Sequence, residues 1–248
     1  MNNVSLGDDM NDRIKNVVVA VVVMALVVSG YYYSLQNKQH KTLEQTYANY
    51  RQQNKDLFKQ QGVVYLKYTE IVEPVVKQVN AHHTSRYLNN PAKNAALEKE
   101  YGAEIARGYV APCTVRFINP EIGYGVFAEA DIPVGRFVGE YTGRIINTND
   151  LKTSKYSWDY PVAHDQKGNP IKTSLDAADA GNEMRYVNHD FIPNAEVKYI
   201  PQGGIWHVCY VANRFIKNGE QILTNYGTKY WGKRGEPHKF VQEDGTQK

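Results

Sequence analysis

An uninterrupted apolar run near the N-terminus is the feature that most constrains how this chain can fold. Every residue from Val17 to Val28 is apolar, and the span from Ile14 to Leu35 contains a single charge, Lys15. About 20 such residues in a helix cross the hydrocarbon core of a bilayer. The tyrosines at 31–33 lie where an interfacial aromatic belt is expected. We therefore predict a transmembrane anchor over residues 14–35, preceded by a polar tail at residues 1–13.

Two other interpretations of this run stay open. The run fits the apolar core of a cleaved signal peptide, and small residues at 28–30 fall at suitable cleavage positions. A buried core helix is the third interpretation, although a helix that also faces water is seldom so uniformly apolar. The orientation of an anchor is not determined, because Arg13 and Lys15 at the start of the span balance Lys38 and Lys41 after it.

Residues 36–108 are polar and rich in Gln, Lys, Asn and Tyr, and we interpret them as a helical segment. Apolar residues recur at alternating steps of four and three, at Leu43, Tyr47, Tyr50, Leu57 and Val64. This spacing predicts an amphipathic helix that packs on the rest of the chain. A dimerising coiled coil is the alternative, weakened by the polar residues Asn54 and Gln61 in the same stripe. Pro74 and Pro91 divide the segment.

Composition excludes several functional classes. The chain has 29 Lys and Arg against 26 Asp and Glu. The resulting net charge of +3 argues against a protein that binds nucleic acid directly along a basic face. The two cysteines, Cys113 and Cys209, cannot build a disulfide framework or an all-cysteine zinc site. The sequence also lacks a P-loop, a nucleophile elbow and the third glycine of a dinucleotide-binding fingerprint.

The sequence pattern changes again at Ala111, where short runs of residues typical of β-strands alternate with Gly, Pro and Asn. Four segments then follow in a fixed order. Ile122–Ala128 (IGYGVFA) is followed by DIPVG, and Gly139–Gly143 reads GEYTG. Leu175–Asn194 matches the pattern D-A-x3-G-N-x2-R-[FY]-x-N-H-x3-P-N without a gap, and Arg214–Gly227 ends in GEQILTNYG. Together these segments resemble the SET domain family of protein-lysine methyltransferases.

The resemblance implies a compact, mainly β fold in which the segment from Arg185 to His189 threads through a loop formed by the final strand. We therefore expect a SET domain over residues 109–233 and a C-terminal tail over 234–248, preceded by the transmembrane helix and the helical segment. The resemblance also implies transfer of a methyl group from S-adenosylmethionine to a lysine side chain. The partner would be a protein with an accessible lysine, and a histone tail is one candidate.

The resemblance also assigns roles to individual residues. Tyr226 and Tyr141 correspond to the tyrosines of the lysine channel and are the catalytic candidates, and Thr224 and Val197 are assigned to the same channel. The residues expected to bind the cofactor are Gly123, Tyr124, Gly125, Asn188, His189, Tyr226 and Trp231. Methyl transfer depends mainly on alignment, and aromatic walls attract a sulfonium or a methylated ammonium. For both tyrosines the alternative is a core side chain whose hydroxyl bonds to a backbone carbonyl.

Some residues depart from the family pattern. Asp190 and Phe191 stand where many members have Ser and Cys, and no cysteine cluster follows Tyr226, so we predict no metal site. Thr224 stands where many members have Phe or Tyr, at the position associated with the number of methyl groups added. Trp231 either stacks on the adenine or covers the channel, with a surface cap on the last strand as the alternative.

The sequence therefore predicts a single-pass membrane protein-lysine methyltransferase. Its catalytic domain is expected to face the cytosol, because S-adenosylmethionine is an intracellular cofactor. A secreted enzyme that acts inside another cell is the alternative localisation. The alternative function is a non-catalytic SET-fold scaffold on a membrane stalk, and a weaker one is methylation of a small molecule. The target lysine and the oligomeric state are not determined by the sequence.

Overall fold

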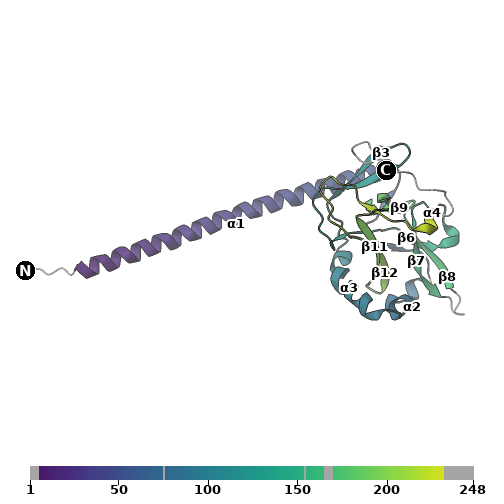
Figure 1. The fold of residues 1–248 in the computed structure, drawn as a ribbon, viewed down its shortest axis with the longest axis horizontal. Helices are drawn as coiled ribbons and strands as arrows, with labels where there is room; N and C mark the ends of the chain where they lie inside the picture. The colour runs from purple at the N-terminus through teal and green to yellow at the C-terminus, as the bar shows by residue number, and fades with distance from the viewer. Residues whose placement is uncertain (1–5, 75, 154, 165–169, 232–248) are drawn as a thin grey trace, which may run out of the picture. The chain divides into compact units, whose positions relative to one another are not determined.

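The computed structural model describes residues 6–74, 76–153, 155–164 and 170–231 (Figure 1). The predicted tail at 234–248 lies outside the described residues. The chain divides into two compact units, Met1–Asn49 and Tyr50–Lys248. Helix α1 (Leu6–Gln60) is the one element described in the first unit, and its residues from Tyr50 onward belong to the second.

The prediction of a transmembrane anchor over residues 14–35 is wrong. Among the described residues, no helix is long and apolar enough to span a membrane. From Val21 the apolar side chains run only to Val28, and α1 then continues through Ser29, Gly30 and three tyrosines into polar sequence. The side chains of residues 14–17, 19 and 20 lie outside the described part. The predictions of a membrane partner and of a single-pass membrane localisation depended on this anchor, so they are wrong as well.

The segment at 36–108 is also less uniformly helical than predicted. Helix α1 ends at Gln60 because Gly62 adopts a left-handed conformation, with φ of 69°. The Gly62 and Val63 amides then donate to the carbonyls of Lys59 and Phe58, which closes the helix in the manner common for a glycine-terminated end. Two short strands follow before the chain returns to helix. These elements are β1 (Val64–Tyr65), β2 (Glu70–Ile71), α2 (Ser85–Leu88) and α3 (Pro91–Ala106).

The described part of the second unit contains many small sheets rather than one large one. The antiparallel pair β3 (Cys113–Asn119) and β4 (Gly123–Ala128) forms one sheet. A second sheet has the order β11 (Ala195–Gln202), β12 (Ile205–Ala212), β5 (Phe137–Glu140). A third has the order β2, β6 (Arg144–Asn147), β8 (Pro170–Asp176), β7 (Ser157–His164). Two further pairs are β1 with β9 (Ala180–Gly181) and β10 (Asn188–His189) with β13 (Leu223–Thr224), and the last helix is α4 (Thr228–Trp231).

The end of α1 is built into the core of the second unit. Phe58 is fully buried, and its ring meets Tyr65 and Tyr186 edge to face at centroid distances of 5.4 and 5.5 Å. Asn54, one turn earlier, is also buried, and its amide donates to the Glu183 carboxylate. Strand β1 then runs parallel to β9 and β2 parallel to β6. The segment after Tyr50 therefore completes two sheets and fills the core.

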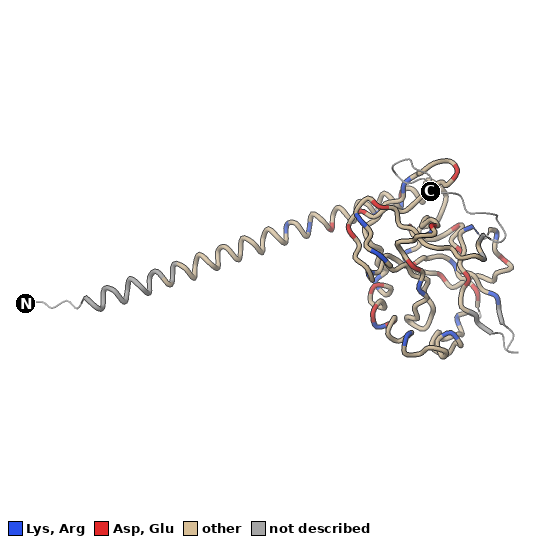
Figure 2. Tube along the Cα trace, in the orientation of Figure 1, with Lys and Arg blue, Asp and Glu red and all other residues tan. Residues whose placement is uncertain are grey.

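Two clusters of buried apolar side chains hold the sheets together. The larger includes Phe58, Val126, Ile145 and Tyr210, and the smaller lies under α3 and includes Ile105. Along the second unit, cationic and acidic residues are interspersed (Figure 2).

Candidate active site

The glycine turn of β4 meets the first residue of β10. The side-chain amide of Asn188 donates to the carbonyl oxygen of Tyr124 at 2.9 Å. A Cβ on Gly125 would come within 3.1 Å of Asn188 Nδ2 and 2.6 Å of Gln221 Nε2, so glycine permits this close approach. Gln221 Nε2 is buried and has no hydrogen-bond acceptor among the described residues. The turn is thus joined to two motif segments and borders an unsatisfied donor.

His189 joins the motif segment to the end of the domain. Strands β10 and β13 are parallel, with His189 opposite Thr224. His189 is buried, and its Nδ1 accepts the backbone N–H of Tyr226 at 3.1 Å. A nitrogen that accepts a hydrogen bond carries no proton, so this contact needs the neutral ring. Burial lowers the pKa of His189 and favours that neutral form.

The hydroxyl of Tyr226 has a fixed orientation. It donates to the carbonyl oxygen of Val187 at 2.7 Å, the backbone contact expected of a core tyrosine. Because its hydrogen points to Val187, the phenol oxygen can act toward any further group only as an acceptor. Burial raises the pKa of Tyr226 well above its ordinary value, so the phenol stays neutral.

Five rings form a connected aromatic cluster around this phenol: Tyr141, Trp158, Tyr210, Tyr226 and Tyr230. The Trp158 ring stands edge-on to Tyr226 at 6.3 Å and to Tyr141 at 6.4 Å. Tyr141 is buried, and burial raises its pKa well above the ordinary value. The two tyrosines predicted as catalytic therefore belong to one cluster, connected through a tryptophan.

Sequence reasoning missed Trp158, Tyr210 and Tyr230. Trp158 and Tyr210 come from β7 and β12, which carry none of the family motifs. The available signal was the alternation of aromatic residues at Tyr156, Trp158 and Tyr160, which is typical of one face of a strand.

The remaining predicted residues have different locations. Thr224 is buried opposite His189, and its Oγ1 has no hydrogen-bond partner among the described residues. Val197 is half-buried in β11 and lines a separate pocket with residues of α2 and α3. Its role in the channel stays a prediction. The side chain of Trp231 lies outside the described residues.

The polar groups at this site suit alignment better than proton transfer. The two phenols and the imidazole are neutral, and each contact above positions a group rather than charging it. The described residues contain no cluster of three or more His, Cys, Asp or Glu that could hold a metal ion. The aromatic cluster offers ring faces, which attract a cation. The arrangement can therefore orient a cationic group and a nucleophile beside neutral side chains.

Comparisons with known proteins agree with this geometry. Residues 123–227 match the family model described as the SET domain. A putative histone-lysine N-methyltransferase of Arabidopsis thaliana is 32% identical over 106 residues, which cover 42% of this chain and 30% of the relative. A histone-lysine N-methyltransferase of Chaetomium thermophilum, EZH2, is 33% identical over 115 residues, 44% of this chain and 8% of the relative. The chain thus spans less than a third of the length of these relatives.

Solved structures show a similar fold. The crystal structure of ATXR5 in complex with a methylated histone H3.1 superposes with a TM-score of 0.54 at 15% identity. The superposition covers 79% of this chain and 92% of the ATXR5 chain. It therefore extends beyond the residues that match the family model and includes elements that precede Gly123.

Proposed function

Because residues 123–227 belong to the SET domain family of protein-lysine methyltransferases, we propose that this chain transfers a methyl group from S-adenosylmethionine to the side-chain amine of a lysine in a protein. The observation that supports this most directly is the phenol of Tyr226. Its hydrogen is committed to Val187, its backbone is held by His189, and its ring lies in the aromatic cluster. Tyr226 and Tyr141 are the proposed catalytic residues.

The residues present fit the cofactor that the family implies. S-adenosylmethionine, when bound, supplies a methyl group on a positively charged sulfur. The glycine turn at 123–125, together with Asn188, His189 and Tyr226, would hold it. The buried Gln221 Nε2 lies beside this turn and needs an acceptor, which a carboxylate or ribose oxygen would provide. We also retain Trp231 as a proposed cofactor contact.

The channel residues would prepare the lysine for attack. An ammonium must lose a proton, here to solvent water, before it becomes nucleophilic, and its ordinary pKa is about 10.4. Removal from water into the aromatic cluster disfavours the charged form and lowers that pKa. The Tyr226 oxygen, restricted to accepting, then orients the amine or a methyl C–H along the line of transfer. The neutral phenols hold their own protons, so neither is assigned the role of a base.

We further propose that Thr224 sets how many methyl groups are added. It replaces the Phe or Tyr of many family members, and its buried Oγ1 has no hydrogen-bond partner among the described residues. The smaller side chain leaves room for a methylated amine or a water. The substrate class is a protein with an accessible lysine. A histone tail is the first candidate because the matched relatives are histone-lysine methyltransferases.

The test measures transfer of labelled methyl groups by the full chain to histone H3 and to other lysine-rich proteins. Tyr226→Phe should reduce the rate about a hundredfold or more, as for removal of one preorganised polar group. Tyr68→Phe, which removes a hydroxyl from an exposed side chain, is the matched control and should keep the wild-type rate.

Calorimetric binding of S-adenosylmethionine separates failure of binding from failure of transfer. Wild-type and Tyr226→Phe proteins that transfer equally well would refute the role of the phenol. A chain that transfers nothing to any protein and binds no cofactor would instead be a non-catalytic scaffold.

A further inference from the structure

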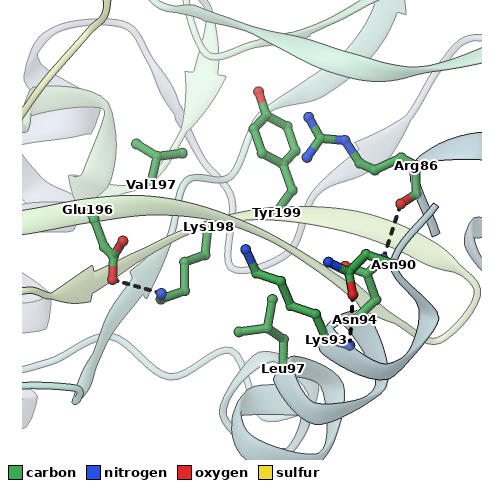
Figure 3. A pocket seen from close by; sticks show the side chains of 9 residues that line it. All are labelled: Arg86, Asn90, Lys93, Asn94, Leu97, Glu196, Val197, Lys198 and Tyr199. Atoms are coloured by element: carbon green, nitrogen blue, oxygen red, sulfur yellow. Dashed lines mark hydrogen bonds and ion pairs between the residues drawn. The ribbon is translucent and has the colours of Figure 1, made fainter.

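The pocket that Val197 lines lies between helix α3 and strand β11. It has a volume of about 300 Å³ and is lined by Arg86, Asn90, Lys93, Asn94, Leu97, Glu196, Val197, Lys198 and Tyr199 (Figure 3). Of these, only Val197 was assigned to the methyl-transfer site, and no residue of the aromatic cluster lines the pocket. We call it the basic pocket.

The basic pocket has an excess of positive charge. Three cations line it, Arg86, Lys93 and Lys198, against one carboxylate, Glu196, which leaves two positive charges in excess. Lys198 is paired with Glu196 at 2.7 Å. Among the described residues, neither the Arg86 guanidinium nor the Lys93 ammonium has an anionic partner. In Figure 3, Lys93 extends from α3 toward β11.

The Arg86 guanidinium stacks on two aromatic rings. Its guanidinium carbon lies 4.1 Å from the ring centroid of Tyr199 and 5.7 Å from that of Trp206. Stacking of this kind occupies the face of the guanidinium and leaves its N–H groups to donate at the edge. Those groups form a fork that matches two oxygens of a carboxylate or phosphate.

Hydrogen bonds hold the walls of the basic pocket in place. The buried Asn94 side chain donates to the carbonyls of Arg86 and Tyr87, each at 3.1 Å, which joins the end of α2 to the first turn of α3. Asn90 caps α3 by accepting the backbone N–H of Lys93. Recognition is therefore left to the side-chain cations, of which Arg86 and Lys93 are exposed to solvent.

From this arrangement, we propose that the basic pocket binds the phosphoryl group of a small phosphate monoester. Such a group carries about two negative charges at neutral pH. It therefore matches the excess of two, which one carboxylate would only half neutralise. The pocket volume lies at the lower end of the range for small-molecule sites, which favours a small ligand over a protein segment. This proposal does not depend on methyl transfer.

The test is calorimetric titration of the full chain with inorganic phosphate, glycerol phosphate and acetate at one fixed ionic strength. Phosphate and glycerol phosphate should bind, and acetate should bind at least about tenfold more weakly, because it offers half the charge. Lys93→Met and Arg86→Gln should each weaken phosphate binding by about tenfold or more, the effect of removing one hydrogen bond to a charged group. Arg86→Lys should bind more weakly than wild type because it loses the planar fork.

Lys99→Met is the matched control, because Lys99 lies on the same helix but does not line the basic pocket. It should bind phosphate as the wild type does. Arg86 stacks on two rings, so its variants are checked for a normal melting curve, and Lys93→Met tests the site if they unfold. Equal binding of acetate and phosphate, or equal weakening by Lys99→Met, would overturn the proposal. A phosphoserine peptide that binds more than tenfold tighter than glycerol phosphate would overturn the small-molecule assignment.

Discussion

Replacing Asn54 by leucine tests how the end of α1 is held. Asn54 is buried and its side chain makes three hydrogen bonds. Nδ2 donates to the carbonyl of Cys113 at 3.0 Å and to Glu183 Oε1 at 3.2 Å, and Oδ1 accepts the N–H of Val115 at 2.9 Å. Leucine has a similar size but can make none of these bonds, so each partner would be left without this contact.

The size of the effect follows from the number of groups left unsatisfied. A buried polar group that loses its partner costs about 1–3 kcal/mol. Glu183 keeps its hydrogen bond from the Tyr65 hydroxyl, so two groups lose their partner, the Cys113 carbonyl and the Val115 N–H. Together they cost at least about 2 kcal/mol, a substantial fraction of the roughly 5–15 kcal/mol by which domains are stable. For a chain of this size, about 2 kcal/mol lowers the melting temperature by about 4–8 °C.

The measurement is thermal unfolding of the full chain, followed by the near-ultraviolet circular dichroism of its tyrosines. Asn49→Leu is the matched control, because Asn49 is exposed and accepts one hydrogen bond, from Gln45 on the same helix. That variant should change stability by less than about 0.5 kcal/mol. If Asn54→Leu melted within about 2 °C of the wild type, the buried hydrogen bonds could not be what holds this segment.

Three further predictions concern buried groups. Burial raises the pKa of Glu183, so its contribution to stability is complete below its ordinary pKa of 4.5 and declines as the pH rises above that value. Urea unfolding measured from pH 4 to 7 should show this decline in the free energy of unfolding. The Glu183→Gln variant should not show it. Burial lowers the pKa of His189, so acidification below about pH 6.5 should destabilise the protein and break the hydrogen bond from the Tyr226 amide to His189. Nuclear magnetic resonance of the Tyr226 amide should report the loss of this hydrogen bond only in acid. Gly125→Ala should displace the Gln221 and Ile118 side chains and crowd Asn188, and it should weaken S-adenosylmethionine binding about tenfold by calorimetry.

Much of the candidate site follows from short continuous motifs. Asn188 and His189 are adjacent in one motif and Tyr226 ends another, and the structure brings the two segments together through β10 and β13. Trp158 and Tyr210 could not be assigned in this way, because their strands contain no motif and their place in the aromatic cluster depends on how the sheets pack.

The packing of the long N-terminal helix depends on residues that its apolar pattern does not reveal. The apolar stripe from Leu43 to Val64 predicts the face of the helix that packs on the rest of the chain, and Asn54 and Gln61 interrupt this stripe. In the structure Leu43 and Val64 are exposed, whereas Asn54 is buried and the Gln61 side chain accepts a hydrogen bond from Tyr186. A polar residue in an apolar stripe can mark a buried hydrogen bond as readily as a break in the packed face. The sequence pattern alone does not reveal the hydrogen-bond partner elsewhere in the chain.

The contact between Asn54 and Glu183 also sets an order of events during synthesis. The two residues are 129 positions apart, and strand β1 pairs with a strand, β9, that lies as late in the chain as residues 180–181. Because a chain leaves the ribosome N-terminus first, Phe58 emerges well before Tyr186, which helps to bury it. Contacts between distant residues form slowly and leave apolar surface exposed in the interval. The part of the second unit that precedes the motif segment Leu175–Asn194 therefore keeps its apolar side chains exposed until that segment has been translated.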